Sequence, residues 1–417
     1  MRVLAIIMAG GANEDLSALT AVRAEAAVPF AGKFRIIDFV LSNCSNSQIF
    51  NVAVLTQYMP ISLNDHIGVG KPWDLDRTRG GIRVFHPYLG PGITGWERGT
   101  ADAVRRNLAF IEEQRVDTVL ILGGNHVYKM DYRPLLKFHQ DSQAEVTVGI
   151  RSVNPFETHH FGIVTTDAGQ RILTFQQKPK RSRDNIASMG VYVFKLEALK
   201  EHLFAHPTHL DFGRDVLPSM IKRKRVIAYK YEGYWARVGT LQAYWEANMA
   251  LLSEMPALDL YDPDWVIHTR SEEQPPVKIG PAAKVHNNLF SNGAIINGVV
   301  EQSVISPGVY IAEGATVMDS VIMNDCRIGS GAVVRQAILD KNIVVGENTC
   351  IGSGDNGWSV PNQLFPDRLN TGLTVIGKGS HIPPDLKIGY NVIIEPGVGP
   401  HHFKSPAVGD GETVKFQ

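Results

Sequence analysis

The chain has 417 residues, with 41 Lys and Arg against 42 Asp and Glu, and 44% of its residues are hydrophobic. This length predicts roughly two or three domains with a core large enough to fold without cross-links. The near-zero net charge argues against a dedicated nucleic-acid or anionic-membrane binder, because such proteins carry a clear basic excess. We expect a small-molecule or protein partner, and neither nucleic acid nor a membrane.

The three cysteines, Cys44, Cys326 and Cys350, show no CxxC or Cys/His ligand spacing. We therefore expect reduced, ordinary core residues, and neither a disulfide framework nor a structural zinc site. The opening MRVLAIIMAGG passes into Gly-Gly without a signal-peptidase site, so it predicts a first strand in a cytoplasmic protein. No apolar run approaches the roughly 18–20 residues that span a bilayer.

Apolar runs alternate with amphipathic stretches from residue 1 to about 253. This alternation predicts a mostly parallel, buried sheet with helices on both faces. The expected helices are Ala101–Glu113 and Leu241–Leu252. The expected strands are Val3–Met8, Val52–Thr56 and Thr118–Leu122, with Val146–Ile150, Ile172–Gln176 and Gly190–Phe194 as a mixed extension of the sheet.

A segment rich in Pro and charge interrupts the alternation after residue 253. We expect it to be an inter-domain linker over 254–277 that packs through Tyr261 and Trp265. The predicted domains are 1–253 and 278–417.

Beyond the linker, aliphatic residues recur every six positions. Each group of three starts 17 residues after the one before, and Gly follows several members where a turn needs a residue tolerant of positive φ. This period predicts a three-sided hexapeptide-repeat β-helix, with an antiparallel sandwich as the alternative. The aliphatic positions are Ile305, Ile311, Val317, Ile322, Ile328, Val334, Leu339, Val345 and Ile351, and after an interruption at 352–373 Ile376, Ile382, Ile388 and Ile394.

Gly10 and Gly11 follow the first strand, where backbone N–H groups at the carboxyl edge of a parallel sheet often bind nucleotide phosphates. Alone this pair is a weak signal, because Gly-Gly after a strand is also an ordinary tight turn. Further motifs sharpen it: AGGANEDLSALTAVRAEAAVPFAGKFRIIDFVLSN, VLTQYMPISLNDHI, WERGTADAV, LGGNHVYKMDY, ASMGVYVF, GYWARVGTLQAYWEAN and LDLYDPDW. In this order, they resemble the ADP-glucose pyrophosphorylase (glucose-1-phosphate adenylyltransferase) family over nearly the whole chain.

The resemblance implies a Rossmann-like, GT-A-like nucleotidyltransferase domain followed by a left-handed parallel β-helix. It also implies the reaction of ATP with glucose 1-phosphate to give ADP-glucose and diphosphate, which supplies glycogen or starch synthesis. The family uses Mg²⁺ and cationic side chains to screen the charge of the phosphates.

The family's phosphate-binding cations are absent from this chain. In the pattern G-G-x-G-x-R-L, Asn13 replaces the third Gly and Asp15 replaces the Arg. In the pattern R-A-K-P-A-V, Glu25 stands at the Lys. Two positive charges near the triphosphate have thus become negative.

The family's two metal-binding carboxylates are absent as well. Asn125 stands at the Asp of G-D-H-x-Y-K-M-D-Y, and Arg237 stands at the Asp of G-Y-W-R-D-V-G-T. Glu97 and Gln177 also depart from the family pattern. We expect no functional catalytic residues and no Mg²⁺ in this chain, and internal ion pairs of Arg237 with Asp15 or Glu25 would then hold the site together.

Other positions retain the family pattern. By resemblance, Gly162, Lys178 and Ser188 match residues that hold the glucose 1-phosphate or ADP-glucose moiety, with a solvated surface residue as the alternative for Lys178. Gly10 and Gly11 are substrate-binding candidates from their place after the first strand. The effector candidates are Arg23, Lys33 and Arg35, for which structural pairing is the alternative.

Three further polar residues admit a catalytic or a structural interpretation. Asp102 suits a helix start with Thr100 as N-cap. His126 and His381 are candidate general bases, but the sequence supplies no other part of an acyl-transfer site.

We therefore expect a non-catalytic regulatory subunit of a hetero-oligomeric ADP-glucose pyrophosphorylase, in a hetero- or homotetramer with a sugar-phosphate or other anionic effector. The alternatives are an active adenylyltransferase with an altered metal site, and a sugar-phosphate sensor built on the same frame.

Overall fold

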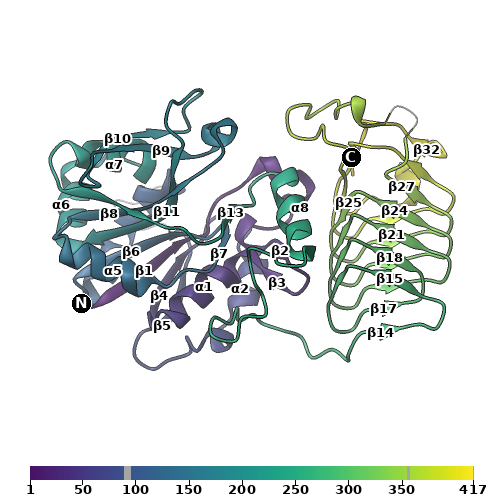
Figure 1. Cartoon of the computed structure of the whole chain (residues 1–417), viewed down its shortest axis with the longest axis horizontal. Helices are drawn as coiled ribbons and strands as arrows, with labels where there is room; N and C mark the ends of the chain where they lie inside the picture. The colour runs from purple at the N-terminus through teal and green to yellow at the C-terminus, as the bar shows by residue number, and fades with distance from the viewer. Residues whose placement is uncertain (89–94, 355–356, 417) are drawn as a thin grey trace.

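The structure, a computed structural model, describes residues 1–88, 95–354 and 357–416, so the last residue of the predicted second domain lies outside it. An α/β domain and a β-helix lie side by side, joined by an extended segment (Figure 1). No helix in the described ranges is long and apolar enough to cross a membrane.

The α/β domain is built on a mixed nine-stranded sheet whose main path runs β10-β9-β11-β6-β1-β4-β5. β1 pairs in parallel with β4 and β6, β11 runs antiparallel to β6, and β8 and β12 branch from β11. The strands are β1 (Val3–Met8), β4 (Asn51–Leu55), β5 (Gly81–Phe85), β6 (Thr118–Gly123), β8 (Val146–Ser152), β9 (Gly162–Thr166), β10 (Ile172–Gln177), β11 (Ile186–Lys195) and β12 (Val226–Lys230).

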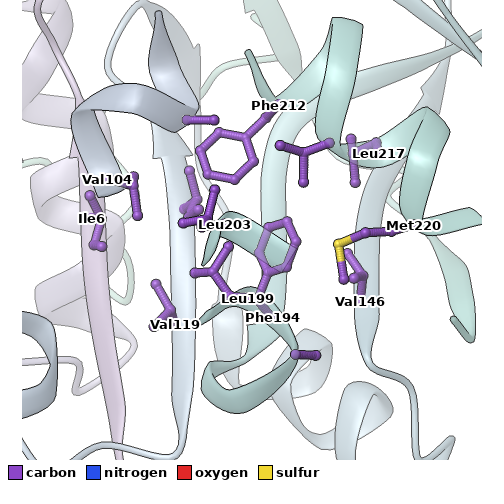
Figure 2. Close-up of a cluster of buried hydrophobic side chains, with 14 of the residues drawn as sticks. Ile6, Val104, Val119, Val146, Phe194, Leu199, Leu203, Phe212, Leu217 and Met220 are labelled. Atoms are coloured by element: carbon purple, nitrogen blue, oxygen red, sulfur yellow. The ribbon is translucent and has the colours of Figure 1, made fainter. Parts of the chain in front are cut away.

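Helices cover both faces of this sheet, which explains why its central strand β1 is apolar on every residue. On one face Leu4 and Ile6 of β1 meet α3, α6 and α7, in the cluster of Figure 2. On the other face Ala5 and Ile7 meet α1, α2 and α5. The helices are α1 (Ile36–Asn46), α2 (Ile61–Ile67), α3 (Thr100–Arg106), α4 (Leu108–Glu113), α5 (Tyr132–Asp141), α6 (Leu196–Ala205), α7 (Leu217–Ile221) and α8 (Leu241–Met249).

The helix expected over 101–113 is divided into α3 and α4 at Asn107. The Asn107 side chain donates to the Ala103 carbonyl at 2.9 Å and competes with the helical backbone pattern. The expected Thr100 cap is wrong, because Gly99 is the N-cap and the Thr100 hydroxyl instead donates to Asp211 at 3.0 Å.

The segment between the domains contains no helix or strand from Ser253 to Val277. Its Trp265 packs against the core and donates its indole N–H to Asn43 at 3.0 Å, as expected. Tyr261 is 79% exposed, so the expectation that it also anchors the segment is wrong. The contact with α1 is made by Trp265, four residues along the chain from Tyr261.

The second domain is a parallel β-helix with three sheets, consistent with the left-handed hexapeptide-repeat form. Every pair of neighbouring strands in it is parallel, so the antiparallel alternative is wrong. One sheet runs from β14 (Lys278–Ile279) to β29 (His381–Ile382), and the second from β15 (Lys284–His286) to β32 (Ala407–Val408). The third comprises β16 (Leu289–Phe290), β19 (Val304–Ile305), β22 (Val321–Ile322), β25 (Ala337–Leu339), β28 (Thr374–Ile376), β31 (Ile393–Ile394) and β33 (Thr413–Val414).

All thirteen aliphatic positions of the repeat point into the β-helix core and are at most 3% exposed. Cys44 and Cys326 are buried, Cys350 is half-buried, and all three thiols are free. The interruption at 352–373 is an excursion between β27 (Cys350–Ile351) and β28.

The third β-helix sheet packs its outer face against the α/β domain. Val321, Ile338 and Val375 join a cluster with Phe30 and Tyr244 of the first domain. This apolar contact is supplemented by one fully buried ion pair, in which Arg23 donates to Asp340 at 2.9 Å.

We expect Asp340→Ala to lower the free energy of unfolding by about 3–5 kcal/mol, because it leaves the buried Arg23 charge without its partner. Asp141→Ala, which removes an exposed pair with Lys137, is the matched control and should cost at most about 1 kcal/mol. Urea unfolding measures both. Equal costs for the two variants would contradict the assigned role of Asp340.

Candidate functional site

A cleft of about 540 Å³ opens at the carboxyl ends of β1 and β6. Gly10 lies against the backbone N of Gln57, where a Cβ would stand 3.0 Å away, so only glycine fits without a shift. Gly11 faces open space, where a Cβ would meet no atom within 4 Å. Both glycines line the cleft, where the sequence predicts them.

The Glu25 carboxylate is buried in the wall of this cleft and is bound by two side-chain amides. Asn13 donates to Oε1 at 2.8 Å and Asn125 donates to Oε2 at 3.1 Å. The Asn13 amide also donates to the Gly239 carbonyl at 2.9 Å. Three of the unusual positions, distant in sequence, thus form one hydrogen-bonded group.

Another unusual position, Arg237, adds a positive charge next to this group. It ends β13 (Trp235–Arg237), which pairs antiparallel with β7 (His126–Tyr128). Burial raises the pKa of the Glu25 carboxyl, and the charge of Arg237 and the two amide bonds oppose that rise. Within the described ranges Arg237 forms no ion pair, so amide hydrogen bonds and a longer-range charge interaction hold Glu25, in place of the expected direct pair.

The backbone N–H of Asp15 donates to the Asn13 side chain at 3.0 Å, but the Asp15 carboxylate contacts the β-helix domain. Asp15 belongs to η1 (Glu14–Leu19), and its carboxylate pairs at 3.0 Å with Arg368 of the excursion at 352–373. Arg368 also pairs with Glu14 at 3.2 Å. The expected ion pair of Asp15 with Arg237 is therefore wrong, because the Asp15 carboxylate pairs with Arg368 of the second domain.

The cleft does not fit Mg²⁺. The Asn125 amide presents its N–H to Glu25, and the Arg237 guanidinium would repel a dication. Among the described residues no three acidic, His or Cys side chains gather as a metal site. The cleft lining of the described chain carries the carboxylates of Glu25, Glu97 and Asp211 against the single cation Arg98, which is the wrong balance for a triphosphate.

The two histidine candidates lie in environments unsuited to a general base. His126 is buried in the cleft wall, and its Nδ1 accepts from the Trp235 indole at 3.3 Å. Burial and the charge of Arg237 lower the pKa of His126 to about 3, so it stays neutral. His381 is exposed on β29 of the β-helix.

Asp102 has a structural environment. It is buried at the start of α3, where it accepts from the backbone of Arg98 at 3.0 Å and pairs with Arg105 and Arg106 at 3.1 Å.

The remaining substrate candidates lie beside the cleft rather than in its lining. Gly162 packs against Phe175 and Gln177, and the Ser188 hydroxyl donates to Tyr192 at 3.1 Å. Gln177 and Tyr192 are the residues of these pairs that line the cleft. Lys178 is exposed, and its charge reaches Glu25. Their role as substrate contacts stays a prediction.

Of the three effector candidates, one is buried in an ion pair and two line a pocket. Arg23 is buried in its pair with Asp340, whereas Lys33 and Arg35 line a second pocket of about 580 Å³ between the domains. Arg35 also donates to the Ser62 carbonyl at 2.7 Å, and burial lowers its pKa to about 10.

Sequence reasoning missed several polar residues of these pockets. Arg270 and Lys341 join Lys33 and Arg35 in the interdomain pocket, and Gln57 and Asp211 line the cleft. Gln57 lies within the motif VLTQYMPISLNDHI, which was a signal for the cleft, whereas Arg270 and Lys341 lie in no local pattern that marks a site, because folding brings them from separate segments. For the interdomain pocket, the one available signal was the charge of Arg270, a cation in the otherwise acidic segment between the domains.

Comparison with known families agrees with this architecture. Residues 4–254 match the family described as nucleotidyl transferase, and residues 277–357 match the GlmU-like C-terminal hexapeptide family. A glucose-1-phosphate adenylyltransferase of Thermomicrobium roseum is 51% identical over 419 residues, which cover 99% of this chain and 97% of the relative. The chain belongs to the glucose-1-phosphate adenylyltransferase family.

Other members of the glucose-1-phosphate adenylyltransferase family are similar over the same length. The relative from Thermotoga maritima is 44% identical and that from Acetivibrio thermocellus 42% identical, each over 99% of this chain, 98% and 97% of the respective relatives being covered. Both domains of this chain therefore have counterparts in the family.

We expect Glu25→Gln to gain thermal stability over the natural chain as the pH rises from 5 to 8. The folded protein holds the Glu25 proton to higher pH than the unfolded chain does, so ionisation above about pH 4.5 destabilises only the natural fold. The difference in melting temperature between the variant and the natural chain is measured across this pH range. Glu232→Gln, at an exposed residue paired with Lys230, is the matched control. Its melting temperature should differ from that of the natural chain by the same amount at every pH in this range. A difference that also stays constant for Glu25→Gln would contradict the buried state of the carboxyl.

Proposed function

We propose that this chain is a non-catalytic member of the glucose-1-phosphate adenylyltransferase family that regulates a catalytic subunit in a mixed oligomer. The observation that carries the proposal is the buried Glu25 carboxylate, which is bound by Asn13 and Asn125 in the cleft that Gly10 and Gly11 also line. An anion there opposes the triphosphate that the family's reaction requires.

The repulsion between the Glu25 carboxylate and a triphosphate can be sized from Coulomb's law. Two unit charges about 4 Å apart interact by about 4 kcal/mol at an effective dielectric of about 20. A sign change at one position therefore removes several kcal/mol from transition-state stabilisation, and each ~1.4 kcal/mol is tenfold in rate. Glu25 and Arg237 carry two such changes close to one another.

The interdomain pocket supports a regulatory role. Lys33, Arg35, Arg270 and Lys341 line it against the acids Asp65 and Glu272, so it favours an anionic effector. Because both domains contribute to its walls, an anion bound there favours one relative arrangement of the domains. Such a preference changes a neighbouring subunit only through contacts that differ between the two arrangements.

A second candidate is an active adenylyltransferase with an altered metal site. The observation in its favour is that relatives up to 51% identical over 99% of the chain carry this enzyme name. The cleft also retains Gly10 and Gly11 and a volume of about 540 Å³.

Purified alone with ATP, glucose 1-phosphate and Mg²⁺, the chain should form ADP-glucose at least roughly 1,000-fold more slowly than an intact family member, as expected from a loss of about 4 kcal/mol. Co-expressed with an intact subunit of the same organism, it should change that subunit's effector response. Turnover by the chain alone at a rate near that of the intact member would overturn the proposal in favour of the second candidate.

A reversal series provides the control for this measurement. Asp15→Arg, Glu25→Lys, Asn125→Asp and Arg237→Asp restore the family's charges at these positions, and Asn13→Gly restores its glycine. Partial sets should recover little because these residues act as a unit. Arg368→Ala belongs in a parallel arm, since Arg368 would repel an arginine at position 15. Equal turnover in the full series and the natural chain would contradict the charge argument.

Affinity for sulfate should fall as the pH rises through about 8. Burial and the charges of Arg35 and Arg23 lower the pKa of Lys341 to about 8, so this lysine of the interdomain pocket loses its charge there. Sulfate keeps its own charge over this range. Lys341→Met should weaken binding roughly tenfold at pH 7, the effect of one charge-assisted contact, and remove most of the pH dependence. Isothermal titration measures both.

Lys341→Arg is the charge-conserving control and should bind sulfate with little pH dependence between 7 and 9. Lys137→Met, at an exposed lysine of α5, should leave the natural profile unchanged. If sulfate affinity depends on pH in Lys341→Met as it does in the natural chain, then Lys341 does not contact the bound anion.

A further inference from the structure

Three histidines gather at the C-terminal end of α6, beside the cleft wall. His202 is 7% exposed, and His206 and His209 are half-buried. The ring nitrogens His202 Nε2 and His209 Nδ1 share a hydrogen bond of 3.0 Å. The His206 ring centroid lies 4.7 Å from the centroids of both other rings. The three imidazoles therefore contact one another directly.

The packing of these rings argues against a metal site. The planes of His206 and His209 are 14° apart, so the two rings are stacked. Stacked rings keep their nitrogens in separate parallel planes, and these nitrogens do not converge on one ion. This agrees with the lack of any three-residue metal site in the part of the chain that the structure describes.

The cluster is fixed to the core through α6. Leu199 and Leu203 of this helix lie in the apolar cluster of Figure 2, on either side of His202 in the sequence. The His206 N–H donates to the His202 carbonyl at 3.0 Å, and the His209 N–H donates to the His206 carbonyl at 3.0 Å. The helix end and the turn after it thus hold the three rings together.

A permanent positive charge from α3 faces the cluster. Arg105 donates to the carbonyls of Leu203 at 3.2 Å and His209 at 2.5 Å, and it pairs with Asp102 at 3.1 Å. A guanidinium stays charged at every physiological pH, so it repels an imidazole that becomes protonated beside it.

This environment keeps the imidazoles neutral. Burial and the charges of His206, His209 and Arg105 lower the pKa of His202 to about 4. Burial lowers the pKa of His209 as well, and the charges of His206 and Arg105 add to this effect.

Two carboxylates oppose these shifts, and each has another partner. Glu201 faces His202, but it pairs with Lys224 at 2.7 Å. Asp215 faces His209, but its Oδ2 accepts from the backbone N–H of Leu210 at 2.8 Å. Neither carboxylate therefore fully compensates a charge on the cluster.

The chain after the cluster leads directly into the cleft wall. The carbonyl of Leu210, next to His209, accepts from the backbone N–H of Ala101 at 2.8 Å and of Asp102 at 3.2 Å. The following residue, Asp211, lines the cleft. A displacement of His209 therefore reaches both the start of α3 and the cleft wall.

We propose that His202, His206 and His209 form a proton-sensitive latch, which holds the segment 206–211 against α3 while the rings are neutral and releases it when they take up protons. One proton between His202 Nε2 and His209 Nδ1 makes their hydrogen bond, whereas two charged rings place an N–H on both nitrogens and break it. Release loosens the cleft wall, and it does so whether or not the cleft is catalytic. The latch is therefore independent of the proposed function.

Linkage gives the direction of the pH effect. In the released segment His202 titrates near its ordinary pKa of 6.5, whereas in the closed latch its pKa is about 4. The closed latch is therefore fully stable above about pH 6.5 and loses stability as the pH falls from there towards 4. Each proton taken up on release increases the opening equilibrium by up to about tenfold per pH unit.

The test is amide hydrogen exchange of the full chain at pH 7.5 and pH 5, followed by mass spectrometry and corrected for the chemical pH dependence of exchange. We expect peptides that span 99–107 and 206–216 to open roughly tenfold or more readily at pH 5. Peptides from β1 and from the β-helix are the internal control and should keep the same protection at both pH values.

Matched variants separate the titration of the rings from their packing. His202→Gln places an amide near the position of Nε2, and His209→Asn places one near the position of Nδ1. The double variant should lose the pH dependence, because neither amide takes up a proton in this range. His209→Lys carries a permanent charge and should open both segments at pH 7.5. His286→Gln, at an exposed histidine of β15, should keep the natural pH dependence.

The natural chain alone decides the inference if a variant does not fold. Equal protection of 99–107 and 206–216 at both pH values would overturn it. So would an equal loss of protection in β1 and the β-helix, because the opening would then be global. In folded variants, the natural pH dependence in the double variant would overturn it as well.

Discussion

The cleft depends on how one buried carboxylate is accommodated. Glu25 begins the short helix η2 (Glu25–Ala27), and its two carboxylate oxygens accept from Asn13 and Asn125. An aspartate at position 125 would place two carboxylates within hydrogen-bonding distance, and a glycine at position 13 would leave one oxygen without its donor. The substitutions are therefore physically linked, because each removes an unfavourable contact that another would create.

The same constraint extends to the boundary between the domains. η1 begins directly after Asn13, so one short segment contributes to the cleft through Asn13 and to the β-helix through Glu14 and Asp15. Arg368 provides the opposite charge from the second domain. The apolar face of the third β-helix sheet and the buried pair of Arg23 with Asp340 hold the two domains in this contact. The segment that supports the cleft wall through Asn13 is therefore the same one that contacts the β-helix.

The strands and the repeat followed from local patterns. Val3–Met8 reads as a continuous apolar run because both of its faces are covered, and it is β1 with the same bounds. The six-residue period of aliphatic side chains specified the β-helix because each coil must place one such residue inward on each side. The helix expected over 101–113 failed at Asn107, where a side-chain hydrogen bond to Ala103 outweighs an uninterrupted hydrophobic period.

By itself, the sequence determined the two folds, the glycine turn and the reversal of charge at Glu25 and Arg237, because these follow from residue type, spacing and family resemblance. Only the tertiary structure decided which charges meet. Asp15 pairs with Arg368, and Glu25 accepts hydrogen bonds from two side-chain amides. Lys341 of the β-helix and Lys33 of the first domain line the same pocket. Asn125 is 100 residues from Glu25, and Arg368 and Lys341 lie in the other domain from Asp15 and Lys33. Electrostatic energy depends on distance in space and on burial, neither of which a linear pattern contains.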